Sequence, residues 1–234
     1  MLVAIVDVET TGLNPETDAV IEVAAILYST EHRAILQQVS TLLPVAANPA
    51  ETVNGISLDM VNASNNHAWD SQDSITDAIV EMMEDSAYIV AFNSDFDQSF
   101  IETMGDTAWQ VETPWSDAAA ITYPRMGHKR DLVNLAIANG IPVVNAHRAL
   151  DDCRILADLL GKVPDLEYQL ARAARPKATV IALVSYDDRH LAKDAGFVWD
   201  SLVSKAWAKR MPIEDTESLP FPVAVPTVSA VVLG

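Results

Sequence analysis

The stretch AIVDVETTGL, residues 4–13, joins an apolar run to two acidic residues. The β-branched residues of Leu2–Val8 predict a buried strand that ends at this point. Residues i and i+2 of a strand face the same side, so Asp7 and Glu9 are expected to point together. Paired carboxylates repel each other unless a cation or a proton lies between them. Taken alone, the stretch is equally compatible with two solvated acids at the end of a strand.

Composition predicts one sizeable domain with a small appendage. The chain has 234 residues, is half apolar and carries a formal charge of −18. The charge is uneven, at −19 over residues 1–167, +4 over 168–210 and −3 over 211–234. An acidic body argues against a polyanionic partner, because phosphates are neutralised by Lys and Arg. The short basic segment points the other way.

The remaining composition bears on the compartment and on metal chemistry. The single cysteine, Cys153, excludes a disulfide framework and a cysteine-based zinc site within the chain. No basic n-region precedes the short apolar run at the N-terminus, and no stretch approaches the length of a membrane span. We therefore expect no membrane association, and a soluble protein of a reducing compartment, the cytoplasm.

The periodicity of the chain predicts an α/β fold, a mixed sheet flanked by helices with an antiparallel hairpin near its start. Sites in open sheets of this kind lie at the carboxyl ends of the central strands. Asp7 and Glu9 follow such an end. Strands are expected at residues 2–8, 19–28, 34–43, 87–91 and 115–117, and helices at 75–83, 97–104, 131–139 and 149–160.

Two further stretches place acids at the starts of helices. AFNSDFDQSF, residues 91–100, and HRALDDCRILADLL, residues 147–160, are each explained singly by ordinary helix capping or loop polarity. Together with the first stretch they supply three separated carboxylate sites and one histidine. That set matches two divalent cations holding a phosphodiester, with a histidine to deprotonate the attacking water.

The segments DVETTG, NSDFDQSF and HRALDD resemble the three motifs of the DEDDh exonuclease family. The resemblance spans roughly residues 2–162, in the right order. The chain is similar to members of that family: the proofreading epsilon subunit of bacterial DNA polymerase III, ribonuclease T and oligoribonuclease. It implies a ribonuclease H-like fold and 3′–5′ hydrolysis to nucleoside 5′-monophosphates with two Mg²⁺ or Mn²⁺ ions. The expected partner is the 3′ end of a nucleic acid, with single-stranded DNA favoured.

The resemblance also implies roles for particular residues. The spacing from His147 to the last acid selects Asp152 over its neighbour Asp151. His147, in place of a tyrosine, indicates the DEDDh branch. The implied metal-binding acids are Asp7, Glu9, Asp97 and Asp152, the implied general base is His147, and the implied substrate contacts are Thr10, Thr11, Gly12, Leu13, Asn93 and Phe100.

Two departures from the family pattern, Phe92 and Asn54-Gly55-Ile56, stand where His and HGI are common, and could alter substrate fit. Two other functions stay open. One is an RNA-trimming exoribonuclease of the same family, since no residue decides recognition of the 2′-OH. The other is a polymerase-accessory nucleic-acid-binding protein with a weak site. A replication-protein partner and a homodimer are both possible.

The expected domains are an exonuclease domain at 1–163, a helical linker at 164–177, a small strand–helix–strand module at 178–211 and a proline-containing tail at 212–234. The module mixes basic residues with Phe197, Trp199 and Trp207, as single-strand binding surfaces do. For at least two of these aromatics, the core of a tiny domain is the favoured interpretation. The tail is expected to lie on a surface or to be disordered. The basic residues 128–130 are expected to form a solvated loop.

Overall fold

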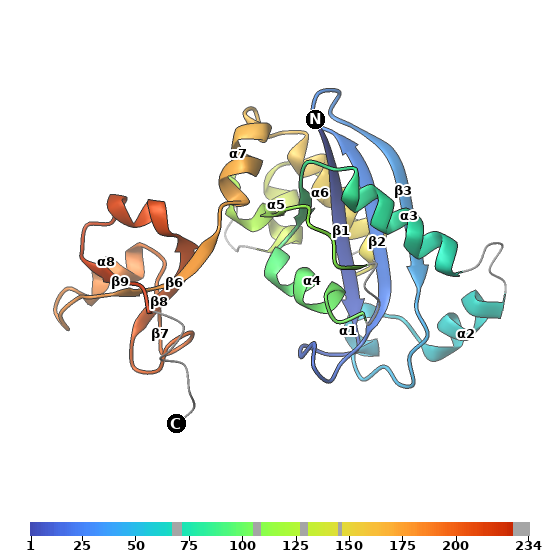
Figure 1. The fold of residues 1–234 in the computed structure, drawn as a ribbon, viewed down its shortest axis with the longest axis horizontal. Helices are drawn as coiled ribbons and strands as arrows, with labels where there is room; N and C mark the ends of the chain where they lie inside the picture. Colours follow the sequence, from blue (N-terminus) through green and yellow to red (C-terminus); the bar gives the residue numbers. More distant parts are fainter. Residues whose placement is uncertain (67–71, 105–108, 127–130, 145–146, 227–234) are drawn as a thin grey trace. The chain divides into compact units, whose positions relative to one another are not determined.

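The computed structural model describes residues 1–66, 72–104, 109–126, 131–144 and 147–226. The chain divides into two compact units, Met1–Ala174 and Arg175–Gly234, which are described separately. Figure 1 gives the elements of each. Within the described part of the chain, no helix has both the length and the apolar character needed to cross a membrane.

The first unit is built on a five-stranded mixed sheet, which confirms the predicted sheet type, and its strand order is β3-β2-β1-β4-β5. The first three strands form an antiparallel meander, and β4 and β5 run parallel to β1. Strand β1 ends two residues later than expected, so Glu9 and Thr10 belong to it. The strands are β1 (Leu2–Thr10), β2 (Val20–Ser29), β3 (Ala34–Leu42), β4 (Ile89–Ala91) and β5 (Trp115–Asp117).

Helices cover both faces of this sheet (Figure 1). Val3 and Ile5 of β1 pack with α5, α6 and α7, whereas Ala4, Val6 and Val8 pack with α3 and α4. Asp7 continues the first series, so its side chain faces α6. The helices are α1 (Glu51–Asn54), α2 (Leu58–Asn66), α3 (Gln72–Glu84), α4 (Ser94–Ile101), η2 (Ala118–Ala120), α5 (Leu132–Ala138), α6 (Ala149–Leu160) and α7 (Leu166–Ala173).

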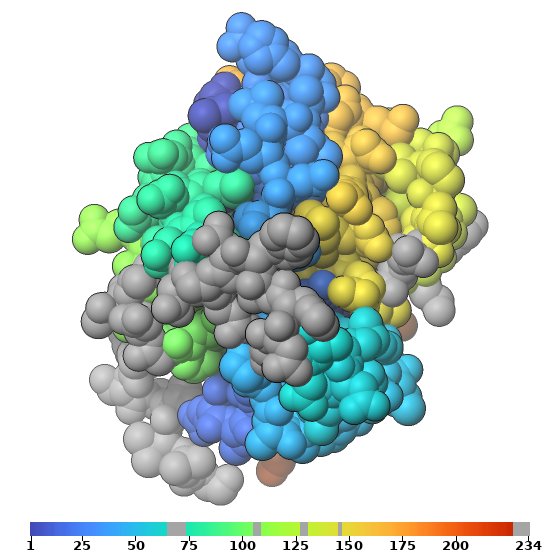
Figure 2. Space-filling model, turned by 90° about the vertical axis from the view of Figure 1, so that its right-hand side faces the viewer, coloured from blue at the N-terminus to red at the C-terminus, as the bar shows by residue number. Residues whose placement is uncertain are grey.

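The packing of α6 explains why the site forms at this end of the sheet. Its apolar residues Ile155, Leu156, Leu159 and Leu160 are buried against the sheet, so its polar first turn is held at the carboxyl end of β1. On the face shown in Figure 2, the surface of α6 lies beside that of β3, and the α1–α2 segment lies below both.

The segment expected as a linker is helical but is not a linker. Helix α7 buries Leu166, Leu170 and Ala173 in the same cluster as α6. The Ser116 hydroxyl also donates a hydrogen bond of 3.0 Å to the carbonyl of Leu170. Because these contacts belong to the main core, the first unit extends to Ala174.

The second unit is a small antiparallel sheet in the order β7-β8-β6-β9, packed on one helix. Strand β9 comes from the segment that we expected to lie on a surface or to be disordered. Phe221 is 8% exposed and packs edge-on against Phe197, with ring centroids 5.5 Å apart. The elements are β6 (Lys177–Ala182), α8 (Arg189–Asp194), β7 (Val198–Trp199), β8 (Trp207–Pro212), η3 (Ile213–Ser218) and β9 (Val223–Ala224).

The aromatic residues of this unit mostly form its core, which is the interpretation that the sequence analysis favoured. Phe197 is buried and Trp207 packs against the same cluster, whereas Trp199 is 52% exposed. The unit is not basic, because residues 175–234 hold seven Lys and Arg and seven Asp and Glu. Arg175 pairs with Glu214 at 2.9 Å and with Asp215 at 2.7 Å. The excess positive charge of residues 175–210 is therefore balanced by the acids of residues 211–234 within the same unit.

Candidate metal centre

The first two acids lie side by side on β1. Asp7 and Glu9 share the face of the sheet that α6 covers, and Glu9 is directly opposite Glu22 of β2. The register of the two strands shifts between Glu9 and Thr10, which ends the regular pairing. The predicted common orientation of Asp7 and Glu9 is therefore built into the strand.

The third acid, Asp97, comes from α4 and is buried against β1. The helix starts at Ser94, three residues earlier than expected, after Asn93 adopts a left-handed conformation with φ of 66°. The Asn93 amide donates to Asp117 Oδ1 at 3.1 Å, which fixes this turn. One helical turn later, Asp97 Oδ1 accepts a 3.1 Å hydrogen bond from the amide of Val8, the residue between the two β1 acids.

The fourth acid and the histidine come from the start of α6. His147 has a left-handed backbone, with φ of 64°, and its amide donates to Asp152 Oδ2 at 3.3 Å. Glu9, His147 and Asp152 each offer one potential metal-ligand atom, and these three atoms all lie within 4.8 Å of one another. Asp151 instead pairs with Arg154 at 3.0 Å, so the two neighbouring acids have different surroundings.

The protein raises the pKa of every acid in this group. Burial, followed by repulsion from Asp97, raises the pKa of Asp7 well above its ordinary value. Burial and repulsion from Asp152 raise the pKa of Glu9 to about 7. Burial raises the pKa of Asp97 to about 8, and burial also raises that of Asp152. Such a cluster is costly while it is charged and uncompensated.

The donor set fits hard divalent cations. Asp152 Oδ1 is buried and has no hydrogen-bond partner among the described residues, so this oxygen lacks a compensating group. Carboxylate oxygens converging from β1, α4 and α6 are the ligands that Mg²⁺ and Mn²⁺ prefer. Cations there would satisfy the unpaired oxygen and offset the repulsion that raises the pKa values.

The turn after β1 is held by its own side chains. The Thr10 hydroxyl donates to the carbonyl of Gly12 at 2.6 Å, and Thr11 Oγ1 accepts from the Ala19 amide at 3.0 Å. A Cβ at Gly12 would collide with the Asp18 carboxylate, so a larger residue there would displace the Asp18 side chain. Leu13 is 84% exposed at the tip of the turn. The turn therefore presents Leu13 to the outside.

Phe100 was wrongly predicted to contact a substrate. Its side chain is 0% exposed and packs on Phe96, with ring centroids 4.9 Å apart, in the cluster beneath α3 and α4. A side chain enclosed in the core cannot touch a bound molecule. Asn93, in contrast, is exposed at the start of α4, on the same element as Asp97. The basic loop residues 128–130 lie outside the described residues.

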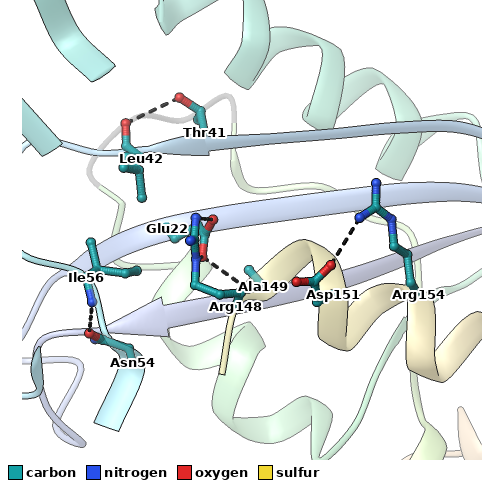
Figure 3. Close-up of polar contacts among 9 residues, drawn as sticks. All are labelled: Glu22, Thr41, Leu42, Asn54, Ile56, Arg148, Ala149, Asp151 and Arg154. Atoms are coloured by element: carbon teal, nitrogen blue, oxygen red, sulfur yellow. Dashed lines mark hydrogen bonds and ion pairs between the residues drawn. The ribbon is translucent and has the colours of Figure 1, made fainter. Parts of the chain in front are cut away.

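Two buried polar residues of the site region make contacts that the sequence analysis did not predict. Asn54 is buried, donates to the Thr10 carbonyl at 3.2 Å, and accepts from the Ile56 amide at 3.0 Å (Figure 3 draws the latter). Glu22 is buried on β2 beside the acid group and pairs with Arg148, next to His147 (Figure 3). A lone acid inside the apolar stretch VIEVAAIL was the available signal for Glu22.

Comparisons with known proteins bear on both units. A family profile described as an exonuclease matches residues 4–160, and one described as a domain of unknown function matches residues 178–225. The chain is 30% identical over 168 residues to DNA polymerase III subunit epsilon of Treponema pallidum, covering 65% of this chain and 72% of that protein. It is 28% identical over 195 residues to ribonuclease T of Klebsiella pneumoniae, covering 75% and 90%.

Solved structures show the same fold. Exonuclease I of E. coli in complex with single-stranded DNA has a TM-score of 0.56 at 19% identity, covering 82% of this chain and 49% of that one. The nuclease domain of 3′hExo, a DEDDh family member bound to rAMP, has a TM-score of 0.56 at 16% identity, covering 72% and 94%. The exonuclease profile spans most of the first unit, and this chain belongs to the DEDDh exonuclease family, hydrolases that act on nucleic acids.

Proposed function

We propose that this protein is a metal-dependent 3′–5′ exonuclease that releases nucleoside 5′-monophosphates. The carrying observation is the convergence of acids from β1, α4 and α6, with His147 close to two of them. We assign Asp7, Glu9, Asp97 and Asp152 to the binding of two divalent cations. Cations bound there would polarise the terminal phosphodiester and stabilise the charge that develops on its oxygens.

In this mechanism the protein supplies a base and an oriented set of anionic ligands. His147 takes the proton of the attacking water, and its exposed ring leaves room for that water beside the acids. The left-handed loop before α6 places the histidine, while α6 itself places Asp152. Asp97 is held to the β1 backbone by its bond from Val8, so its second oxygen keeps a fixed direction.

We assign binding of the 3′-terminal nucleotide to the turn after β1. The Thr10 hydroxyl donates within the turn and Thr11 Oγ1 accepts a bond there, and we propose that this turn, Thr10 to Gly12, contacts the 3′-terminal nucleotide. Leu13, exposed at the tip, is placed to pack against the terminal base. Asn93 lies at the start of the helix that carries Asp97 and is the third proposed contact.

Single-stranded DNA is the proposed substrate class. The similarity to exonuclease I in complex with single-stranded DNA supports it, and the similarity to ribonuclease T over 90% of its length supports RNA as the alternative. A protein that only binds nucleic acid is less well supported, because all four acids and the histidine are present around one centre.

The test is a gel assay with 5′-labelled single-stranded DNA and matched RNA, each with Mg²⁺ or EDTA. A ladder that shortens from the 3′ end only with Mg²⁺ supports the proposal, and the faster substrate identifies the class. Asp7→Ala is expected to remove the ladder. Asp151→Asn is the matched control, because Asp151 pairs with Arg154 outside the acid group. An active Asp7→Ala protein would refute the assignment.

A further inference from the structure

An ion pair with a buried carboxylate and a half-exposed arginine joins β2 to the start of α6. Arg148 donates from Nη2 to Glu22 Oε1 at 2.8 Å and from Nε to Oε2 at 2.9 Å, a two-pronged contact that Figure 3 shows. The Ala149 amide donates to the same Oε2 at 3.1 Å. The Glu22 side chain is 4% exposed and that of Arg148 is 37% exposed. Three hydrogen bonds therefore converge on one carboxylate.

The place of this contact in the chain gives it a consequence for His147. Arg148 directly follows His147 and is the residue before the first turn of α6, yet its own side chain does not cap the helix. Glu22, on strand β2, supplies the missing acceptor, because its carboxylate accepts the hydrogen bond from the Ala149 amide. It thereby fixes the two residues that follow the left-handed backbone of His147.

The ion pair also lies beside the acid group. Glu22 is the cross-strand partner of Glu9, so a further negative charge lies beside an already repulsive cluster. The Arg148 guanidinium offsets that charge and occupies both carboxylate oxygens. The carboxylate of Glu22 is therefore compensated by Arg148 while its Oε2 also holds the backbone of Ala149.

We propose that Glu22 and Arg148 are positioning residues, which set His147 relative to Glu9 and Asp152 through the backbone at the start of α6. This proposal rests on the proposed role of His147 as the base. It predicts that breaking the pair slows the chemical step and leaves substrate binding nearly unchanged. Neither side chain touches the nucleic acid in this assignment.

The kinetic test uses Arg148→Met, which removes the guanidinium but keeps an apolar stem, and Glu22→Met, which removes both acceptors. Each is expected to lower kcat by about tenfold to a hundredfold, the cost of misplacing a catalytic group, with KM changed less than about twofold. Glu22→Gln keeps an acceptor for Ala149 and is expected to fall between Glu22→Met and the wild type. Arg154→Met is the matched control, an exposed ion-pairing arginine on the same helix, and is expected to leave kcat unchanged.

A double-mutant cycle separates positioning from a general structural effect. In a His147→Ala background, Arg148→Met has no base left to misplace, so it is expected to cost less than about twofold in kcat. If the kcat losses of the two single variants multiply in the double variant, the proposal is overturned. A raised KM with unchanged kcat would also overturn it, because it would place Arg148 in contact with the substrate.

Hydrogen exchange gives a readout that does not depend on activity. The Ala149 amide is expected to exchange at least about tenfold faster in Glu22→Met than in the wild type, with amides in the middle of α6 unchanged. Unchanged exchange at Ala149 would refute the pair as a backbone anchor. If the wild type has no Mg²⁺-dependent turnover, the proposed exonuclease function fails, and the exchange measurement still decides whether the pair holds the start of α6.

Discussion

Replacing Glu9 with Gln is expected to stabilise the metal-free protein at pH 8 while removing its activity. The folded protein raises the pKa of Glu9 from 4.5 to about 7. Between these values the folded state binds more protons than the unfolded state, so stability falls as the pH rises. The ionised carboxylate is therefore a cost to folding that is fully present above about pH 7 and absent below about pH 4.

The size of the effect follows from the shift. At about 1.4 kcal/mol per pH unit, the shift corresponds to about 3 kcal/mol, and partial exposure of Glu9 reduces this to about 2 kcal/mol. Glutamine has the same shape without the charge, so Glu9→Gln should recover about 2 kcal/mol at pH 8. For a unit of this size, that is a rise in Tm of about 4–8 °C.

The assay is thermal unfolding followed by circular dichroism in EDTA at pH 8 and pH 5. The gain should be large at pH 8 and much smaller at pH 5. Saturating Mg²⁺ should raise the Tm of the wild type more than that of Glu9→Gln, because a bound cation compensates the same charge. Glu16→Gln, an exposed glutamate in the following loop, is the control. An equal gain at both pH values, or none at pH 8, would refute this account of the acid group.

Three further changes test other parts of the structure. Asp97→Asn can still accept the hydrogen bond from Val8, so the variant should fold but lose at least about a hundredfold in kcat. Calorimetry should show fewer bound Mn²⁺ ions, and a normal metal stoichiometry would contradict the role of Asp97 as a metal ligand. Asn54→Ala should lower the free energy of unfolding by about 1–3 kcal/mol in urea, because it removes buried bonds to Thr10 and Ile56; an unchanged midpoint would count against that role. Phe221→Ala should lower the stability of the second unit by about 3–5 kcal/mol while hydrolysis of a short oligonucleotide stays normal. An equal loss of stability in both units would contradict this prediction.

The main sheet and the acid group were accessible from the sequence because they depend on local patterns. The i, i+2 spacing of Asp7 and Glu9 determines a shared face once the strand is identified. The position of Asp97 near the start of a helix determines which end of the sheet it reaches. His147 and Asp152 were located by motif spacing, and the structure brings both to Glu9.

The failures involve contacts between distant parts of the chain. Glu22 and Arg148 are 126 residues apart, and no local pattern pairs them. For Phe100, the motif supplied a position in α4 but not the direction of the side chain, which packing beneath α3 decides. Strand β9 has only two residues, so its existence depends on the open edge of β6. Helix α7 was identified, but its burial depends on Ser116 and the α6 cluster.

Cys153, the single cysteine of the chain, lies next to Asp152 and is buried below the acid group. Its thiol is 3.6 Å from the carbonyl oxygen of Ile5 on β1, and burial raises the pKa of the thiol well above its ordinary value. A thiol reagent can reach it only when α6 separates from the sheet. The chain thus contains its own chemical reporter: the rate of Cys153 alkylation measures how often the centre opens, without any label being introduced.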